Sequence, residues 1–586
     1  MARNGADILV DTLMAFGVDT IFGLPGDGIN GIMEAIRQRQ GRIRFIQVRH
    51  EESAAFAAVG HAKLTGRLGC CLATTGPGGT HLLTGLYDAK LDRAPVIAIT
   101  GAPYHDLIDS FTQQDVDHSK VFMDVAVYSA RLMGARHVEN AVSLACRHAL
   151  GHRGVAHLSV PVDVQEEPEE AETASDRNVK NHVSLARAED IRCAPPDEIA
   201  RAAEVLNAGS KVAILAGQGA LSAVDELKRT AEILGAPIIK ALLGKGLLAD
   251  DDPLTTGGIG LLGTRASQEV MEACDALLIV GSTFPYIEYY PKPDQARGVQ
   301  IDRDPTRIGL RFPVEVGLAG DARQTLAALN EKLEEKADRS FLQEAQRWAR
   351  EWRDLLRTSV EEARTPMPPG RIVRDLGDRL DENAIVVFDS GHNTGLMARY
   401  VNAKAGQSYV GSGLSASMAC GIPYAVAAAL AFPGRQVVAI MGDGGLSMLM
   451  GELATIARYR LPIKLLVLNN GTLGQIKWEQ MLFLGNREYE CDLTPIDFVK
   501  VAEGCGIKGW RVEDPADSAA VVEAALAHDG PALIEAVIDT HEPLLPPKRN
   551  EKYVENMEKA LREGTPGADE IRERLATEPL RTMWEG

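Results

Sequence analysis

The feature that most constrains the fold of this 586-residue chain is a carboxylate after one apolar run and an amide after the next. The runs 435–440 and 463–468 have the composition of buried strands, and the segment 446–459 between them has helical spacing. This order predicts a parallel sheet, in which ligands bind at the carboxyl ends of the strands. Asp443 and Asn470 would meet at that edge. Gly-Asp-Gly or Asn-Gly alone is more often a turn, and the strand–helix–strand setting favours a ligand site.

Oxygen ligands of this kind are what Mg²⁺ needs in order to hold a diphosphate on a protein. The ion prefers hard oxygen donors and keeps only a few protein contacts beside the phosphate oxygens. Glycine beside the carboxylate lets the backbone approach a phosphate closely, because it carries no side chain. Three glycines flank Asp443 in this way: Gly442, Gly444 and Gly445.

The bulk properties of the chain exclude several classes of function. Its length requires more than one hydrophobic core, and three or four domains are expected. The net charge of −19 argues against a nucleic-acid partner, because phosphate repels an acidic surface. No apolar run reaches transmembrane length, and the N-terminus lacks the apolar core of a signal peptide. The eight cysteines have no Cys-x-x-Cys spacing, so we expect a cytoplasmic protein without disulfides or a zinc site.

Short apolar runs alternate with helical stretches along most of the chain, which predicts an α/β fold. An acidic, proline-containing segment after residue 164 and a proline-rich break near residue 368 divide this pattern into three units. Each unit is expected to be a doubly wound parallel sheet. The predicted boundaries are 1–164 for the first unit, 165–194 for a solvated linker, 195–335 for the central unit, 336–369 for a helical linker, 370–545 for the third unit and 546–586 for a charged tail.

The spacing of Gly442-Asp443-Gly444 and Asn469-Asn470 resembles the thiamine diphosphate motif. From about residue 4 to residue 545, the chain is similar to the pyruvate oxidase and acetolactate synthase family of thiamine enzymes. The resemblance implies that the first unit binds the pyrimidine of the cofactor, that the central unit is a flavin-binding-like domain, and that the third unit binds the diphosphate. It also implies a cofactor held between the first unit of one chain and the third unit of another, so a homodimer or homotetramer is expected.

Glu51 is the residue that the resemblance assigns to activation of the cofactor. A carboxylate at the start of a helix is usually only a favourable partner for the helix dipole. The family, however, has a glutamate after Arg-His, as in Arg49-His50-Glu51, where it exchanges a proton with a pyrimidine nitrogen. The match assigns this role to Glu51 rather than to Glu52.

Other residues near predicted strand ends are expected to hold thiamine diphosphate. A methionine among small residues is usually core filler, but the resemblance gives Met418 the role of propping the cofactor into a bent shape. The backbone carbonyl of Thr472 is expected to complete the protein's share of the metal shell with Asp443 and Asn470. The remaining expected contacts are Pro25, Gly76, Ser390, Gly391 and His392.

The segment 258–263 fits the Gly-x-Gly-x-x-Gly dinucleotide pattern, but no strand is predicted to lead into it, so the usual phosphate-loop interpretation fails. It resembles instead a flavin-contacting stretch of pyruvate oxidases, as do 281–286 and 300–305. Each stretch alone would more often be a turn at a strand end. Together they imply FAD, with the contacts Gly260, Gly263, Gly281, Ser282, Thr283, Phe284 and Asp302.

Glu479 and Gln114 are expected to take part in catalysis at the substrate pocket. The sequence Ile-Lys-Trp-Glu-Gln at 476–480 is similar to that of pyruvate oxidases, whereas acetolactate synthases tend to have tryptophan where Glu479 stands. Glu479 could handle protons on the substrate, or it could simply pair with Lys477 on the surface. The chain also departs from the oxidase pattern, because it lacks two aromatic residues at the places of Gln113 and Gln475.

These features predict oxidative decarboxylation of a 2-oxo acid, most simply pyruvate, with electrons passed from flavin to a quinone or to oxygen. An acetolactate synthase-like carboligase or lyase, which joins the decarboxylated acid to a second carbonyl compound, is the alternative. A non-catalytic binding or regulatory relative is an alternative from another class, although Glu51, Asp443 and Asn470 are all retained. The tail is expected to pack on its own subunit, and its acidic run argues against a helix on a membrane surface.

Overall fold

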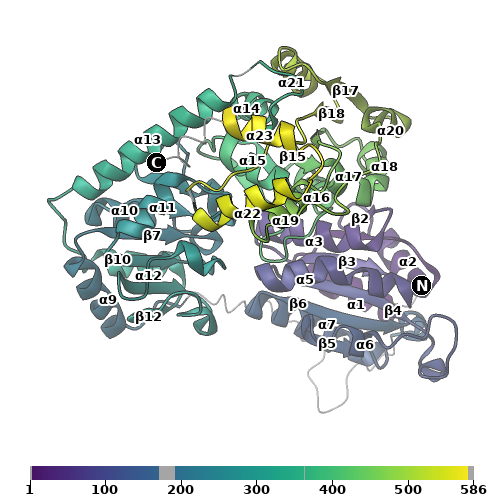
Figure 1. The fold of residues 1–586 in the computed structure, drawn as a ribbon. Helices are drawn as coiled ribbons and strands as arrows, with labels where there is room; N and C mark the ends of the chain where they lie inside the picture. The colour runs from purple at the N-terminus through teal and green to yellow at the C-terminus, as the bar shows by residue number, and fades with distance from the viewer. Residues whose placement is uncertain (1–2, 170–191, 362, 549, 578–586) are drawn as a thin grey trace.

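Three α/β units follow one another along the chain, and each contains a six-stranded sheet in which all paired strands are parallel (Figure 1). The computed structural model describes residues 3–169, 192–361, 363–548 and 550–577. The fold class predicted from the alternation of apolar runs and helices, three doubly wound parallel sheets, is confirmed.

The four inner strands of the first unit are buried along their whole length, as continuous apolar runs in a parallel sheet should be, whereas its two edge strands are more exposed. Its strands are β1 (Thr20–Gly23), β2 (Arg44–Gln47), β3 (Gly69–Ala73), β4 (Val96–Ala102), β5 (Ala126–Arg131) and β6 (Val155–Pro161), in the order β2-β1-β3-β4-β6-β5. Its main helices are α1 (Gly5–Ala15), α2 (Asn30–Gln38), α3 (Glu51–Thr65), α4 (Pro77–His81), α5 (Leu83–Asp92) and α7 (Ala135–His152).

The third unit repeats the strand order of the first unit. Its strands are β13 (Ile385–Phe388), β14 (Ser408–Val410), β15 (Val437–Gly442), β16 (Ile463–Asn469), β17 (Lys508–Val512) and β18 (Ala532–Val537), in the order β14-β13-β15-β16-β18-β17. Its helices include α14 (Pro369–Arg379), α15 (His392–Tyr400), α16 (Gly421–Ala431), α17 (Asp443–Leu449), the short helix η7 (Met450–Glu452), α18 (Leu453–Arg458), α19 (Gly474–Leu482), α20 (Phe498–Gly504) and α21 (Ser518–Ala527).

The central unit has a different topology. Its strands are β7 (Val212–Ala216), β8 (Ile238–Lys240), β9 (Thr255–Gly258), β10 (Ala276–Val280), β11 (Arg297–Asp302) and β12 (Val316–Ala319). Counted from one to six along the chain, they lie in the order 3-2-1-4-5-6, which is the order of dinucleotide-binding sheets. The strand order reverses between β7 and β10, and α9 (Pro196–Ala208), α10 (Val224–Leu234), α11 (Arg265–Ala273) and α12 (Ala322–Asn330) flank the sheet.

One expectation about this unit is wrong, because a strand does lead into the segment 258–263. β9 ends at Gly258 and α11 begins at Arg265, so the glycines lie between a strand and a helix. The strand escapes prediction because its residues, Thr-Thr-Gly-Gly, contain no apolar run. It is an edge strand, however, and lies two strands away from the point where the strand order reverses.

A solvated linker does not begin at residue 165. α8 (Val162–Glu166) continues from β6, and the buried side-chain amide of Gln165 donates to the carbonyl oxygens of Gly28 and Val160. Glu169 pairs with Arg3 at 3.2 Å, which fastens this segment to the first unit. Residues 170–191 of the predicted linker lie outside the described residues.

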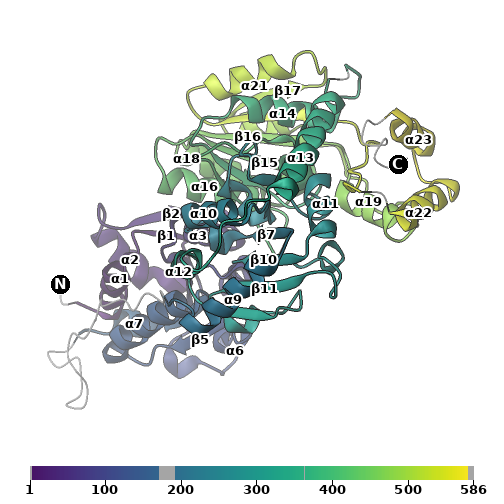
Figure 2. The same cartoon turned by 90° about the vertical axis from the view of Figure 1, so that its left-hand side faces the viewer.

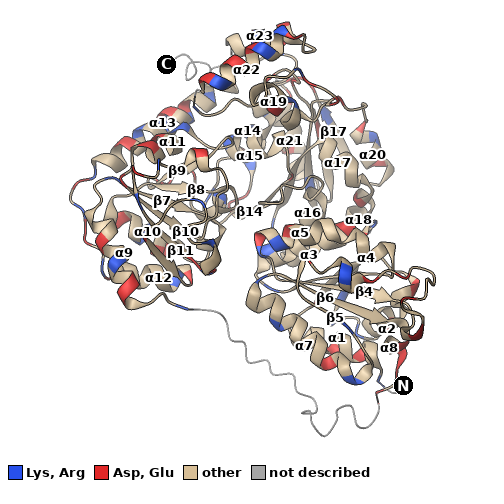
Figure 3. Cartoon of the chain, turned by 60° about the horizontal axis from the view of Figure 1, so that its bottom comes forward, with Lys and Arg blue, Asp and Glu red and all other residues tan. Residues whose placement is uncertain are grey.

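The charged helix expected between the central and third units is α13 (Ser340–Ser359). It buries Phe341, Trp352 and Leu356. Acidic and basic residues are interspersed along its length (Figure 3), and Arg347 pairs with Glu344 and Glu351.

The first and third units share one hydrophobic core, which is built on the contact between α3 and α16 (Figure 3). Both helices bury mainly alanines, so their backbones approach closely. A Cβ atom at Gly60 of α3 would lie 3.0 Å from the ring of Tyr424 in α16. Lys63 closes the same interface, because its ammonium pairs with Asp92 at 2.6 Å and donates to the carbonyl oxygen of Gly411 at 3.0 Å.

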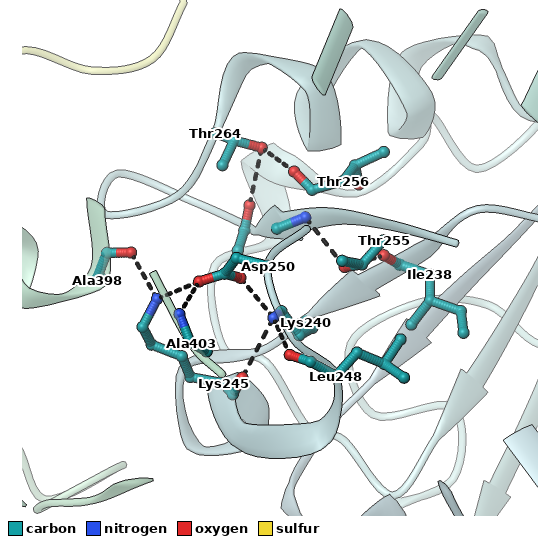
Figure 4. Close-up of polar contacts among 12 residues, drawn as sticks. Ile238, Lys240, Lys245, Leu248, Asp250, Thr255, Thr256, Thr264, Ala398 and Ala403 are labelled. Carbon is teal, nitrogen blue, oxygen red and sulfur yellow. Dashed lines mark hydrogen bonds and ion pairs between the residues drawn. The ribbon is translucent and has the colours of Figure 1, made fainter. Parts of the chain in front are cut away.

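A second buried ion cluster joins the central unit to the third unit (Figure 4). The carboxylate of Asp250 accepts from Lys240 at 2.6 Å and from Lys245 at 3.0 Å, and it also accepts the backbone N–H of Ala403 at 2.7 Å. Lys245 donates in addition to the carbonyl oxygen of Ala398 in α15 at 3.0 Å. Although burial raises it, the pKa of Asp250 is held well below its usual range by the two lysines.

The tail folds back on α19 through α22 (Glu551–Arg562) and α23 (Ala568–Thr577), as Figures 1 and 2 both show. Met557, Ala560 and Leu561 of α22 pack against Trp478 and Met481 of α19. The apolar face of the tail is therefore covered by its own subunit. Within the described ranges, no helix has both the length and the apolar character needed to cross a membrane.

Asp250→Ala should destabilise the fold by about 3–5 kcal/mol, because it leaves two buried ammonium groups without their shared counter-ion. The folded pKa of Asp250 is lowered, so its contribution is present above the unfolded carboxyl pKa of about 3.9 and is lost only as the pH falls below it. Thermal unfolding at neutral pH measures the effect. Asp251→Ala, at the exposed neighbouring acid, is the control, and equal midpoints for the two variants would contradict the expectation.

Candidate active site

The predicted metal ligands come together at the carboxyl edge of the third sheet. Asp443 is the first residue of α17, directly after β15, and Asn470 and Thr472 follow the neighbouring strand β16. The carboxylate of Asp443 accepts the N–H of Gly471 at 2.9 Å, so it points across to the β16 side. Thr472 uses its carbonyl oxygen to accept the N–H of Gly474 at 2.8 Å, and a second lone pair remains on that oxygen.

Asp443 is a buried carboxylate that forms no ion pair with any cationic side chain of the described residues. Burial raises the pKa of this group to about 6, although backbone N–H groups of Gly444 and Gly471 act in the opposite direction. A buried charge without a partner is costly. A divalent cation would supply the missing partner, so the site fits the predicted Mg²⁺.

The residues predicted to contact the diphosphate lie beside this carboxylate. Ser390 and Gly391 follow β13, and α15 begins at His392 with no side-chain cap on its first turn. His392 is buried, and its Nδ1 atom has no hydrogen-bond partner in the described structure. Burial lowers the pKa of His392 to about 4, so the ring is neutral at physiological pH. An uncapped helix start and an unpartnered nitrogen are what an anionic group would satisfy.

Met418 lies against the same glycine-rich turn. A Cβ atom at Gly444 would be 3.3 Å from the methyl carbon of Met418, and a Cβ at Gly445 would be 2.5 Å from the carboxylate of Asp389. Asp389 accepts the N–H of Ala419 at 3.1 Å and that of Ser390 at 2.7 Å. This buried acid therefore fixes the segment that carries Met418. Its closeness to position 445 also means that only glycine fits there.

Glu51 lies at the carboxyl edge of the first sheet, as the first residue of α3. It is buried, and its Oε2 atom lies 3.0 Å from Nδ1 of His81 at the end of α4. The ring of His50 stacks on that of His81 with centroids 4.6 Å apart. The ligand atoms of these three residues lie close enough together to bind a metal ion. Nδ1 of His50 accepts the N–H of Glu52 and caps α3.

The turn that begins at Gly76 approaches Glu51, because a Cβ atom at Gly78 would lie 3.4 Å from Oε1 of Glu51. Gly76 adopts a positive φ of 58°, and a Cβ there would be 2.8 Å from Cβ of Gln114. Gln114 also has a positive φ, and its side chain bonds to the hydroxyl of Thr75. His118 is buried below this turn, where its Nε2 atom lies 2.9 Å from the carbonyl oxygen of Gly76. Pro25 is exposed on the loop after β1, at the same sheet edge.

The two groups of residues form separate half-sites within one chain. Among the described contacts, none joins the carboxylate of Glu51 to that of Asp443. The loop before Glu51 instead binds Glu452, which follows the C-terminal end of α17. Asp443 is at the other end of that seven-residue helix, about 10 Å away along its axis.

The predicted flavin contacts gather at the carboxyl edge of the central sheet. Gly281, Ser282, Thr283 and Phe284 follow β10, and Asp302 ends β11. Gly281 meets the turn after β7, because a Cβ at Gly217 would lie 2.6 Å from the carbonyl oxygen of Gly281. This close approach falls where the strand order reverses, which is where dinucleotides bind in such sheets. Gly260 packs on the ring of Phe284, and Gly263 lies on the same loop beside Gly258.

A group of arginines borders this edge of the central unit. Arg93 of the first unit lies 3.5 Å from Asp302, and Arg303 pairs with Asp321 at 2.6 Å. Arg153 is half-buried and pairs with no acid among the described residues, while partial burial and repulsion from Arg303 and Arg93 lower its pKa. An unpaired guanidinium beside other cations suits a phosphate-containing ligand.

Glu479 does not pair with Lys477. Lys477 is buried and pairs with Glu488 at 2.7 Å, so the surface ion pair considered from the sequence is wrong. Glu479 accepts from the side-chain amide of Gln475 at 2.9 Å. Burial and the nearby charge of Glu479 raise the pKa of Tyr286, which places the carboxylate close to the predicted flavin stretch of the central unit.

Two functional candidates were missed from the sequence, His81 and Asp389. Asp389 directly follows the apolar run 385–388, so the rule used for Asp443 would also have singled it out. His81 ends a short helix after the turn that begins at Gly76, and only the folding of that turn brings it to Glu51.

Comparison with known proteins identifies the class. Three models of the thiamine pyrophosphate enzyme match the chain, one in each unit: the N-terminal TPP binding domain over residues 3–121, the central domain over 199–329, and the C-terminal TPP binding domain over 389–536. The fold and the three matched domains together identify the chain as a thiamine diphosphate-dependent enzyme.

Full-length relatives narrow the class to one family. A Bacillus subtilis protein described as thiamine pyrophosphate-containing is 38% identical over 544 residues, covering 92% of this chain and 93% of the relative. The pyruvate oxidase of Lactiplantibacillus plantarum is 33% identical, with coverage of 92% and 89%. The chloroplastic acetolactate synthase of Arabidopsis thaliana is 31% identical, with coverage of 93% and 82%. The chain belongs to the pyruvate oxidase and acetolactate synthase family, as predicted, and is a thiamine diphosphate-dependent enzyme that decarboxylates 2-oxo acids.

Asp443→Asn should separate cofactor binding from folding. The variant removes a buried carboxylate that has no cation partner, so the protein without cofactor should melt at or above the wild-type temperature. Wild-type protein with Mg²⁺ and thiamine diphosphate at about 100 times their dissociation constant should gain about 2.7 kcal/mol, and the variant should lose this gain. Calorimetry with and without the ligands measures both effects. Asp492→Asn, at an exposed acid nearby, should keep the gain, and an undiminished gain in Asp443→Asn would contradict the assignment.

Proposed function

We propose that this enzyme catalyses the oxidative decarboxylation of pyruvate or a close 2-oxo acid, using thiamine diphosphate, Mg²⁺ and FAD, and passes electrons to a quinone or to oxygen. The observation that carries the proposal is the position of Glu479. Burial and the charge of this carboxylate, which stands in an oxidase-like sequence, raise the pKa of Tyr286 in the central unit. The sheet of that unit has the strand order of dinucleotide-binding proteins.

Thiamine diphosphate, when bound, accepts the electron pair that is released as carbon dioxide leaves the substrate. In this chain, Glu51 would hold and exchange a proton at a pyrimidine nitrogen. His81, 3.0 Å from the carboxylate, would orient it and hold a proton on the shared hydrogen bond. The buried setting of Glu51 keeps water away from this proton. Met418 and Gln114 would shape the walls of the same site.

Mg²⁺ would be held by the carboxylate of Asp443, the side-chain oxygen of Asn470 and the backbone carbonyl of Thr472. All three are oxygen ligands on adjacent loops, and phosphate oxygens and water would fill the other positions of an octahedral shell. His392, together with Ser390 and Gly391 at the start of α15, would bind the diphosphate.

FAD, when bound, would accept two electrons from the decarboxylated substrate. Gly217 and Gly281 leave room for backbone to approach the dinucleotide at the reversal of the sheet. Arg153 and Arg93 would neutralise its phosphates, and Asp302 at the end of β11 would accept from a ribose hydroxyl. These residues fit the flavin that the sequence predicts.

Each active site would be completed by a second copy of the chain. Glu51 and Asp443 lie near opposite ends of α17 in one subunit, and no contact among the described residues joins their carboxylates, which supports a site shared between subunits. A homodimer, or a tetramer made of two such dimers, would pair the acid of one chain with the metal site of the other. A cytoplasmic location belongs to this proposal as well.

A carboligase of the acetolactate synthase type is the second candidate. It is favoured by Gln475 and Gln113, which stand where oxidases carry aromatic residues, and by the acetolactate synthases among the relatives. A non-catalytic relative is disfavoured, because Glu51, Asp443 and Asn470 are all retained in ordered half-sites.

Anaerobic addition of pyruvate to the enzyme with bound cofactors should bleach the flavin absorbance within the time of one turnover. Flavin released on denaturation must first establish that FAD is bound. Glu51→Gln, which keeps the shape of the side chain but cannot exchange the proton, should slow bleaching on the order of 10²–10⁴-fold. Formation of acetolactate with the flavin still oxidised would support the carboligase and contradict the oxidase.

A further inference from the structure

Glu452 is a buried acid that the proposed chemistry does not use. It ends η7, directly after α17, and is only 2% exposed. Among the described ion pairs, none involves its carboxylate. Its charge is instead satisfied by three hydrogen-bond donors, two of which belong to the first unit.

These two donors are the backbone amides that immediately precede Glu51. Oε1 of Glu452 accepts the N–H of Arg49 at 2.9 Å and that of His50 at 3.1 Å. Oε2 accepts the hydroxyl of Thr455 at 2.5 Å, which orients the carboxylate from within its own unit. Hydrogen bonds to an ionised acceptor are stronger than neutral ones.

Each backbone N–H group from Gln47 to His50, between β2 and α3, donates a hydrogen bond to another part of the fold. The amide of Gln47 donates to the hydroxyl of Tyr459 at 2.7 Å, and the amide of Val48 donates to the carbonyl oxygen of Gly23 at 3.0 Å. Glu452 accepts the N–H groups of the next two residues, Arg49 and His50. His50 is the N-cap of α3, and Glu51 is its first residue. The position of the His50 backbone therefore determines where α3 begins and where the side chain of Glu51 lies.

We propose that Glu452 is a positioning residue, which fixes the carboxylate of Glu51 by holding the amides of Arg49 and His50 from the third unit. This inference rests on the proposed role of Glu51. An acid that must meet a pyrimidine nitrogen tolerates little displacement, because a misplacement of about 1 Å can cost on the order of a hundredfold in rate. Glu452 acts through hydrogen bonds rather than through its charge, so an amide of the same shape should replace it.

Two variants of the dimeric holoenzyme test this proposal. Glu452→Ala should slow exchange of the reactive thiazolium proton of bound thiamine diphosphate on the order of a hundredfold, and should lower kcat similarly while KM for pyruvate stays within about threefold. Glu452→Gln can still accept both amides through its oxygen and donate to Thr455 through its nitrogen. It should stay within about threefold of wild type in both measurements.

A readout that needs no cofactor is backbone hydrogen exchange in the peptide that contains residues 45–52. Protection of the Arg49 and His50 amides should fall in Glu452→Ala and be retained in Glu452→Gln. Glu503→Ala, at an exposed acid of α20 in the same unit, is the control and should keep protection and proton exchange. If Glu452→Ala does not fold, Glu452→Asp, whose shorter side chain withdraws the acceptor, takes its place.

The outcomes separate this inference from the proposed function. A wild-type enzyme that exchanges the cofactor proton, together with an alanine variant that exchanges it equally fast, would overturn only the positioning role. Equal loss in the alanine and glutamine variants would also overturn it, because charge would then be the relevant property. A wild-type protein that binds no thiamine diphosphate would overturn the proposed function and this inference with it.

Discussion

The close packing of α3 against α16 is the contact on which the arrangement of the functional groups depends. Because both helices bury alanines and α3 has Gly60 at the contact, Tyr424 of α16 packs directly against α3. Near the C-terminal end of α3, Lys63 forms a buried ion pair with Asp92. As a result, Glu51 is fixed relative to the third unit of its own chain, but at the end of α17 that lies away from Asp443.

Unsatisfied polar groups mark the places where ligands are expected. In the described part of the chain, the carboxylate of Asp443 pairs with no cation, Nδ1 of His392 has no hydrogen-bond partner, and the guanidinium of Arg153 pairs with no acid. Asp443 and His392 are buried, and Arg153 is half-buried. Such groups are costly in a folded protein unless something else satisfies them. All three lie at or beside the carboxyl edge of a parallel sheet, where the fold leaves space for phosphate and metal.

Sequence patterns predicted the elements that carry continuous apolar runs. The predicted strand 463–468 matches β16 to within one residue, and the predicted strand 435–440 matches β15 to within two residues at each end, because buried parallel strands consist largely of Val, Ile and Leu. β9 was missed, because an edge strand of threonine and glycine has no such run. The resemblance supplied roles for Glu51 and Asp443. The alternative in which Glu479 pairs with Lys477 is excluded only by the structure, because helical spacing could not reveal that Lys477 is buried beside Glu488.

Contacts between distant segments were beyond the sequence altogether. His81 reaches Glu51, and Glu452 reaches the amide of His50, only because two sheets and their helices dock in a particular way. No periodicity or motif records such a contact. The same docking makes the central unit a neighbour of α19, where Glu479 approaches Tyr286.

If each active centre takes its acid from one chain and its metal-binding carboxylate from another, two inactive variants should complement each other. Glu51→Gln and Asp443→Ala proteins are mixed under conditions in which subunits exchange. A mixed dimer then has one centre with both native residues and one centre with neither, so random exchange should restore about one quarter of wild-type activity. Activity that stays at the level of the separate variants after proven exchange would contradict a site shared between subunits.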